Sequence, residues 1–264
     1  MARRITILGC GSSGGVPRVA QGWGVCDPAN PKNRRRRCSI LVEQIGPGGV
    51  TRILVDASPD LREQLLDAGV DRLDAVLITH SHADHTHGID DLRALGQYMG
   101  CLVDVWMDRS TSEVTRAAFR YAFETPAGSL YPPILKEHRL TAGAACRIDG
   151  PGGPIELLPF RLDHGEIDSL GFRFGDVAYT PDLVRVPPES IPALAELDLW
   201  IIDALRYEPH PTHLCVADAL SLIERLRPRR AVMTNLGVEI DHERLRSELP
   251  EGVQPAHDGM VLDI

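Results

Sequence analysis

Four side chains that commonly bind metal ions lie close together in the stretch His80-Ser81-His82-Ala83-Asp84-His85. The apolar run at residues 75–79 before them is rich in β-branched residues and predicts a buried strand. His80 and His82 are two residues apart on extended backbone, so their side chains point to the same side. Zn²⁺, Mn²⁺ and Fe²⁺ all accept neutral imidazoles and carboxylates as ligands. The stretch therefore predicts a metal site at the carboxyl end of a strand.

The elements around this stretch alternate between strand and helix. Residues 52–56 predict a strand, and residues 59–68 predict a helix that stops at Gly69. Further apolar runs predict strands at 4–8, 38–42, 103–106, 155–162, 169–174, 199–202 and 231–234, and helices at 112–122 and 216–225. This alternation is typical of an α/β protein.

A glycine-rich segment, residues 9–17, follows the first predicted strand. Its glycines permit the backbone to approach a ligand or a neighbouring loop closely. The spacing does not match Gly-x-Gly-x-x-Gly at the start of a helix, because Pro17, Pro28 and Pro31 follow. We therefore do not predict a dinucleotide site here.

Lys32 and the arginines at positions 34–37 form a basic run before the second predicted strand. Two interpretations remain open for this run. It is either a solvated charged loop, or one or two of its arginines neutralise a substrate phosphate through their paired donors. Arg37 is our candidate for the second role.

Length and composition indicate a globular domain with a large core. The chain has 264 residues, 43% of them apolar, and we expect a single domain over residues 1–264. Its formal net charge of −9 argues against long nucleic acid as a partner. The cysteines have no repeated spacing, which fits a reducing compartment better than a disulfide scaffold. We recognise neither a signal peptide nor a membrane-spanning run, and therefore expect a cytoplasmic protein with no membrane partner.

The run His-x-His-x-Asp-His after a strand resembles the signature of the metallo-β-lactamase fold superfamily. The glycine-rich segment most resembles its phosphodiesterase branch, which includes the cyclic-phosphate phosphodiesterase of phosphonate breakdown and the tRNA 3′-end endonuclease. The resemblance implies an α/β fold, an αββα four-layer sandwich with two facing mixed β-sheets. Relatives in this branch hold a structural zinc with several cysteines, but this chain has only Cys26 in that region. We do not expect that zinc here.

The resemblance also implies a binuclear centre for two divalent ions, Zn²⁺ or Mn²⁺. The ligands implied for the first ion are His80, His82 and His164, and those for the second are Asp84, His85 and Asp182. A carboxylate has two oxygens and can span ions about 3.5–4 Å apart, so Asp182 is expected to bridge them.

Other residues are implied in supporting roles. Asp56 and Asp203 would orient ligand-bearing segments without binding metal themselves. Asp84 and His213 are the catalytic candidates. The resemblance gives His213 the role of general acid or phosphate contact, and the alternative is a position beside a helix start with no catalytic role. The candidates for substrate contacts are His87, Asp90, Arg93 and Arg37. For the first three, which follow the motif, the alternative is that they form an exposed polar face of a helix.

The chain departs from its family after the strand at residues 231–234. Related enzymes supply one more imidazole there for the second ion, whereas this chain has Asn235 and Gly237. Three explanations remain: Asn235 coordinates through its carbonyl, His242 or His257 folds into the site, or the second ion is held weakly. We favour the weakly held second ion.

The resemblance implies a metal-dependent hydrolase in which a metal-bound hydroxide attacks the substrate. The leading substrate class is a small phosphodiester, such as a cyclic phosphate or nucleotide. One alternative is a carboxylic ester, thioester or lactone hydrolase that uses the same ions. Another is an accessory or binding protein of low activity, similar to the superfamily member of pyrroloquinoline quinone biosynthesis. A homodimer is also an expectation from the family likeness.

Overall fold

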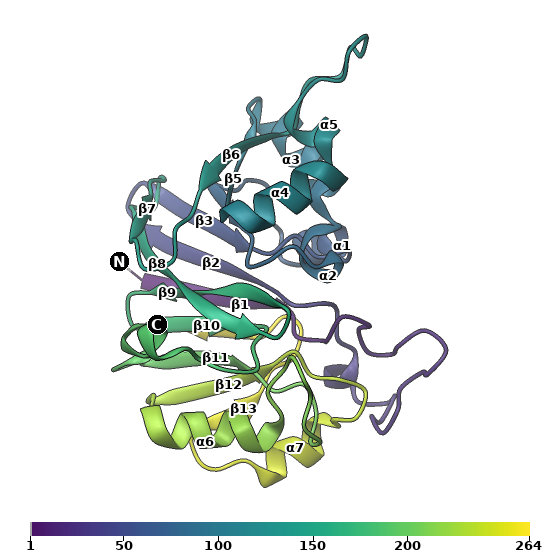
Figure 1. Cartoon of the computed structure of the whole chain (residues 1–264), viewed down its shortest axis with the longest axis vertical. Coiled ribbons are helices and arrows are strands. Elements are labelled where there is room, and N and C mark those ends of the chain that lie inside the picture. The colour runs from purple at the N-terminus through teal and green to yellow at the C-terminus, as the bar shows by residue number, and fades with distance from the viewer. Residues whose placement is uncertain (1) are drawn as a thin grey trace.

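Two seven-stranded β-sheets lie face to face in the computed structural model, which describes residues 2–264 (Figure 1). In order across the first sheet, the strands are β14 (Val261–Asp263), β1 (Ala2–Gly9), β2 (Ser39–Gly46), β3 (Gly49–Val55), β4 (Ala75–Leu77), β5 (Val103–Met107) and β6 (Leu135–Arg139). In order across the second, they are β13 (Val253–Pro255), β12 (Arg230–Thr234), β11 (Leu199–Asp203), β10 (Val177–Thr180), β9 (Ile167–Phe174), β8 (Ile155–His164) and β7 (Cys146–Ile148).

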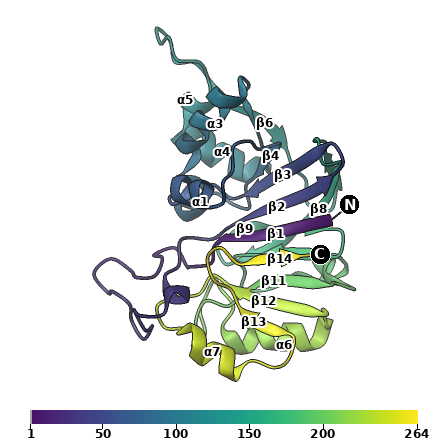
Figure 2. The same ribbon diagram turned by 180° about the vertical axis from the view of Figure 1, so that it is seen from behind.

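Helices cover the outer face of each sheet, as the two opposite views show (Figures 1 and 2). Those beside the first sheet are α1 (Leu61–Asp67), α2 (Ala83–Thr86), α3 (Leu92–Met99), α4 (Arg109–Ala118) and α5 (Arg120–Phe123). Those beside the second are α6 (Val216–Leu226) and α7 (His242–Glu248). Three short 3₁₀ helices are η1 (Pro31–Asn33), η2 (Ile89–Asp91) and η3 (Pro188–Leu194). The predicted αββα sandwich with two mixed sheets is confirmed.

Alternating apolar side chains explain the four layers. In β3, Ile53 and Val55 enter the core between the sheets, whereas Leu54 packs beneath the helices of the first sheet. In β11, Ile201 faces the central core and Trp200 packs towards the helices of the second sheet. Successive side chains of a strand point to opposite faces, so a strand that is apolar at every position requires cover on both sides.

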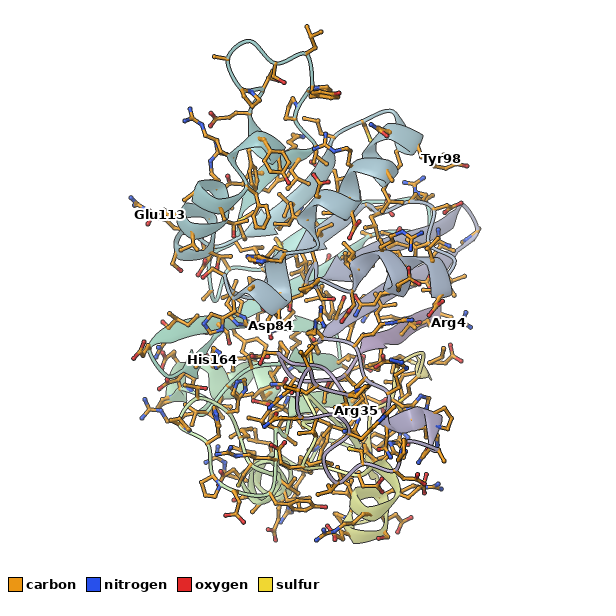
Figure 3. The ribbon with its side chains drawn as sticks, turned by 90° about the vertical axis from the view of Figure 1, so that its right-hand side faces the viewer. Arg4, Arg35, Asp84, Tyr98, Glu113 and His164 are labelled. Carbon is orange, nitrogen blue, oxygen red and sulfur yellow. The ribbon has the colours of Figure 1, made fainter. Side chains whose placement is uncertain are left out.

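Each sheet contains a parallel part that directs loops to the site. Strands β3 to β6 are parallel in the first sheet, and β10 to β13 are parallel in the second. The carboxyl ends of neighbouring parallel strands meet at one sheet edge, so the segments after β4, β10, β11 and β12 gather there. Figure 3 shows Asp84 and His164, which come from the two different halves, lying near each other.

One predicted helix is wrong in its bounds. Residues 112–122 were expected to form one helix, but α4 begins at Arg109, where the Asp108 side chain accepts a hydrogen bond from the Thr111 amide at 2.8 Å. The helix then breaks at Phe119, whose φ and ψ of −122° and 40° are not helical, and α5 follows. None of the helices within residues 2–264 is long and apolar enough to cross a membrane.

The basic run does not behave as one solvated loop, because Arg35 is only 2% exposed. The Arg35 guanidinium donates hydrogen bonds to the Gly237 carbonyl at 3.1 Å and to the Ile240 carbonyl at 2.8 Å. It also donates to Asn33 Oδ1 at 3.2 Å. Arg35 therefore fastens the N-terminal segment to the loop that follows β12.

We expect Arg35→Leu to lower the free energy of unfolding by about 3 kcal/mol, because buried carbonyl groups lose their donors. Urea denaturation measures this change. The neighbouring Arg34→Leu is a matched control, since Arg34 is exposed and its guanidinium only lies over the Trp23 ring. Equal stability of the two variants would contradict the role given to Arg35.

Candidate metal centre

Three imidazoles converge at the sheet edge. His80 follows β4, His82 immediately precedes α2, and His164 is the last residue of β8. His82 Nδ1 lies 3.0 Å from His80 Nε2 and 3.3 Å from His164 Nε2. Nitrogens bound at the usual zinc distance with tetrahedral geometry are about 3.3 Å apart. The spacing therefore fits a single ion at the centre of the three rings.

The opposite nitrogens of two of these rings are already engaged. The Thr79 hydroxyl donates to Asp56, so it accepts from His80 Nδ1 at 2.9 Å. His164 Nδ1 donates to the Thr212 carbonyl at 2.7 Å. Both bonds leave the Nε2 lone pair directed at the cluster. Burial lowers the pKa of both rings, which keeps them neutral as metal ligands must be.

A second group of donors adjoins the first. His85 Nε2 lies 3.4 Å from Asp84 Oδ2 and 3.3 Å from Asp182 Oδ1. His85 Nδ1 is 2.7 Å from Asp56 Oδ2, which fixes the ring. His85 Nε2 is buried and has no hydrogen-bond partner among residues 2–264. Because a buried polar atom is normally paired, this nitrogen indicates where a cation would bind.

Asp182 lies between the two groups. Its Oδ1 faces His85, whereas its Oδ2 lies 3.6 Å from His164 Nε2 and 3.9 Å from His80 Nε2. Burial raises the pKa of Asp182, but the surrounding imidazoles, led by His85, outweigh it and hold the pKa well below the usual range. The carboxylate is therefore ionised, and each oxygen is directed at a different ligand group.

The charges around His85 also favour a cation. Burial lowers the pKa of His85, but the carboxylates of Asp182, Asp56 and Asp84 outweigh it and raise the pKa well above the usual value. Three carboxylates around one imidazole produce a strongly negative potential. A divalent ion can neutralise that potential in place of the proton.

The supporting candidates from the second sheet also lie at the site. Asp203 Oδ2 accepts from His213 Nδ1 at 3.0 Å and from the Leu183 amide at 3.2 Å. His213 Nε2 points towards the cluster, 3.8 Å from Asp182 Oδ2. Burial lowers the pKa of His213, but Asp203 outweighs it and raises the pKa to about 9. Asp203 thus favours the protonated form of His213.

Asn235 occupies the place of the missing imidazole. Its side chain is buried, and its Nδ2 donates to Asp203 Oδ1 at 3.1 Å and lies 3.5 Å from Asp182 Oδ1. Its φ of 62° is in the left-handed region, which Asn tolerates better than most residues. Asn235 therefore lies beside the second ligand group.

The two alternative replacement ligands lie elsewhere. The His242 and His257 rings lie edge-on to each other with their centroids 6.0 Å apart, and the His242 amide donates to Asn33. Possible ligand atoms lie close together in three groups, which are His80, His82 and His164; His80, His85 and Asp182; and His164, Asp182 and His213. Neither His242 nor His257 belongs to any of these groups. The idea that a distant histidine replaces the missing ligand therefore has no support in the geometry.

The predicted substrate contacts near the motif also lie outside the cluster. His87 is exposed against the Phe119 ring, and Asp90 and Arg93 pair with each other at 3.0 Å beside α1 and α3. Arg37 Nε pairs with Asp60 Oδ2 at 3.0 Å. The structure brings none of these four residues into the cavity of the cluster.

A cavity of about 500 Å³ opens in front of the ligands. His82, Asp84, His164, Asp182 and His213 line one side. The remaining lining residues come from the glycine-rich segment and from the loops after β11 and β12, and include Ser12, Arg18, Arg206, His210 and Glu239. Arg18 was not among the predicted site residues, although it directly follows the glycine-rich segment.

Comparison with known proteins places the fold in a family. Residues 51–234 match the model of a β-lactamase superfamily domain. The chain belongs to the β-lactamase superfamily. A crystal structure of a diphosphatase from the PhnP family is 34% identical, with a TM-score of 0.87, and the match covers 98% of this chain and 97% of that one.

Two curated relatives of this chain have names that differ from each other and from that of the diphosphatase. An octanoyltransferase from Porphyromonas gingivalis is 32% identical over 97% of this chain, and a ribonuclease Z from Bradyrhizobium sp. is 30% identical over 64% of it. The chain spans about half the length of each, 51% and 52% respectively. These names therefore do not by themselves assign an activity to this member.

We expect the purified protein to retain divalent metal after dialysis, and His164→Ala to lose most of it, because one of three converging nitrogens is removed. Elemental analysis of the dialysed protein measures the content. His87→Ala is the matched control, since His87 follows the same motif but is exposed outside the cluster. Equal metal content in both variants would argue against this site.

Proposed function

We propose that this chain is a metal-dependent hydrolase that cleaves a small phosphodiester. The observation that supports this most is the cavity of about 500 Å³, which is lined both by the converging imidazoles and carboxylates and by Arg18 and Arg206. Metal ligands beside guanidinium groups suit a phosphorus centre, whose oxygens carry negative charge. A cavity of this size accommodates a nucleotide-sized molecule.

Divalent ions held by these ligands would activate water for attack and neutralise charge on the phosphate oxygens. The chain itself provides the proton for the leaving oxygen. Asp203 favours the protonated form of His213 and fixes its Nδ1, and the Nε2 of His213 lies 3.8 Å from Asp182 Oδ2 at the cluster. A positioned general acid of this kind contributes about 10²–10⁴ in rate. Asp84 and Asp182, whose oxygens lie 3.4 Å and 3.3 Å from His85 Nε2, would help to hold the second ion.

Two relatives support phosphorus as the target. The PhnP-family diphosphatase covers nearly the whole chain at 34% identity, and the second is named ribonuclease Z. Cleavage at a phosphate ester or anhydride is common to both names. The small cavity and the net charge of −9 favour a small substrate over a long RNA.

We expect the protein to release p-nitrophenolate from bis(p-nitrophenyl) phosphate when Mn²⁺ or Zn²⁺ is supplied. His82→Ala should reduce kcat/KM by about a hundredfold or more, because it removes a central ligand. Absorbance at the nitrophenolate band gives the rate. If the parent protein is no faster than His82→Ala, the enzyme proposal fails and an accessory or binding role replaces it.

A carbon ester or thioester is the second candidate, and the octanoyltransferase relative is the observation that favours it. Only about half of that relative is matched, so its name can refer to its other half. Octanoyl thioesters assayed beside the phosphodiester separate the two proposals. Turnover of the thioester with no turnover of the phosphodiester would establish the second candidate.

We expect Asn235→His to tighten binding of a second ion by about tenfold or more, since it places an imidazole beside Asp182. Titration with Mn²⁺ against a chelating dye measures both affinities. Gly237→His is the control, because a Cβ there would lie 2.4 Å from Glu239 Oε2 and 3.0 Å from the Leu205 carbonyl oxygen. Unchanged second-ion affinity in Asn235→His would contradict the proposal that Asn235 weakens this position.

A further inference from the structure

A second cavity, of about 460 Å³, lies on the outer face of the first sheet. Strands β14, β1 and β2 form its floor, and α1 and residues 31–36 form its walls. We infer that this cavity binds a small organic anion with an apolar body, and that the bound molecule is an effector of the candidate metal centre. The inference does not depend on the proposed hydrolase activity.

The floor of this cavity is partly apolar because of the alternation along its strands. Ile5 of β1 enters the core between the sheets, so Thr6 points to the outer face. Leu41 of β2 and Val261 of β14 are both register partners of Thr6, so the three side chains share this face. Val261 is 51% exposed although it is apolar. A ligand with an apolar body would remove this side chain from water.

The carboxylates in the walls already have cationic partners. Glu43 accepts a hydrogen bond from Arg52 Nε at 2.9 Å, and Asp67 Oδ2 pairs with Arg36 Nη2 at 2.6 Å. Each of these negative charges therefore has a guanidinium beside it.

Arg34 differs from the other arginines of the cavity, because it has no carboxylate partner. Arg4 and Arg36 are both in ion pairs. Among residues 2–264, no carboxylate oxygen lies within 4.0 Å of the Arg34 guanidinium, which lies over the Trp23 ring at 6.0 Å from its centroid. A carboxylate, sulfonate or phosphate group on the ligand would supply the partner that Arg34 lacks.

Asp258 also lines this cavity and connects it to the glycine-rich segment. Its Oδ1 accepts from the Cys10 amide at 3.1 Å, and its Oδ2 accepts from the Arg36 amide at 2.8 Å. The two amides occupy the carboxylate oxygens, so Asp258 fastens Cys10 to the wall of the cavity. A ligand that moves this carboxylate would therefore move the start of the glycine-rich segment.

The backbone of Cys10 continues this connection to the candidate metal centre. The Cys10 carbonyl accepts from the Leu236 amide at 2.8 Å, next to Asn235. Asn235 Nδ2 in turn lies 3.5 Å from Asp182 Oδ1. Two hydrogen-bonded backbone segments thus join the second cavity to the second ligand group.

A molecule in this cavity would not lie at the reacting centre. The cavity shares no lining residue with the one in front of the candidate metal ligands. Figure 3 shows Arg4, which lines the second cavity, well away from Asp84 and His164. The ligand would therefore act through the connection at Asp258, and an effect of this kind is reciprocal between the two sites.

Two fluorescent probes with similar rings test the binding site. 8-Anilinonaphthalene-1-sulfonate is an anion, whereas N-phenyl-1-naphthylamine has the same rings without the charge. We expect Arg34→Gln to weaken binding of the anionic probe by about fivefold and to leave that of the neutral probe within about twofold. Thr6→Trp should weaken both probes by about tenfold or more, because the indole fills the cavity over the floor.

Arg227→Gln is the matched control for Arg34→Gln. Arg227 is also exposed, but it does not line the cavity. Equal affinity for the anionic probe in the parent protein and in both arginine variants would overturn the anionic class of ligand. Unchanged binding of both probes in Thr6→Trp would show that they bind elsewhere and would refute the site.

The effector role has a separate test that requires no turnover. Mn²⁺ is titrated calorimetrically into the parent protein and Thr6→Trp, with and without saturating 8-anilinonaphthalene-1-sulfonate. We expect the probe to change the Mn²⁺ dissociation constant of the parent by about threefold or more, and to have no effect in Thr6→Trp. An unchanged constant in the parent, or the same change in both proteins, would refute the connection through Asp258.

Discussion

The candidate metal centre depends on one buried carboxylate, Asp56. This residue follows β3, has a left-handed φ of 66°, and is fully buried. It accepts hydrogen bonds from the Thr79 amide at 2.8 Å and from the Thr79 hydroxyl, and it holds His85 Nδ1 at 2.7 Å. Burial raises the pKa of Asp56, whereas His85 and Thr79 lower it. A carboxylate buried without such donors would be too costly, so the segments that supply them must stay together.

In the second sheet, a buried carboxylate also orients an imidazole. Asp203 is the last residue of β11 and is fully buried, and it orients His213 as Asp56 orients His85. Each sheet therefore ends in a carboxylate that turns an imidazole towards Asp182. Because both carboxylates lie at the ends of parallel strands, the fold places them without any long loop. The candidate general acid His213 and the candidate ligand His85 are thus both oriented by a buried carboxylate at a strand end.

The part of the site whose residues are close together in the chain could be predicted from the sequence. His80, His82, Asp84 and His85 lie within one turn region, so their spacing alone brings them together. His164 and Asp182 were expected only through the family resemblance, because nothing local links them to the motif. The fold class followed from apolar strands that alternate with helices, as in the run at residues 75–79. Short strands such as β7 and β13 carry too few residues to show any periodicity.

The predicted substrate contacts that lie away from the cavity are side chains whose direction is set by distant partners. Within the basic run, Arg37 was the chosen substrate contact, but Asp60 pairs with it, and the carbonyls of Gly237 and Ile240 bury Arg35. Similarly, the candidates after His85 lie outside the cavity, where His87 contacts the Phe119 ring and Asp90 pairs with Arg93. Such partners cannot be identified from one sequence without knowing the sheet order.

The division of the ligands between two sheets also constrains how the protein matures. His80 and His82 are made early in synthesis, but Asp182 follows β10, which pairs in the second sheet. A ribosome-bound chain that ends before this strand offers only a partial set of donors. Contacts so distant in sequence form slowly, because a long loop must close first. Tight capture of an ion is therefore a late event in biogenesis, after the halves have docked.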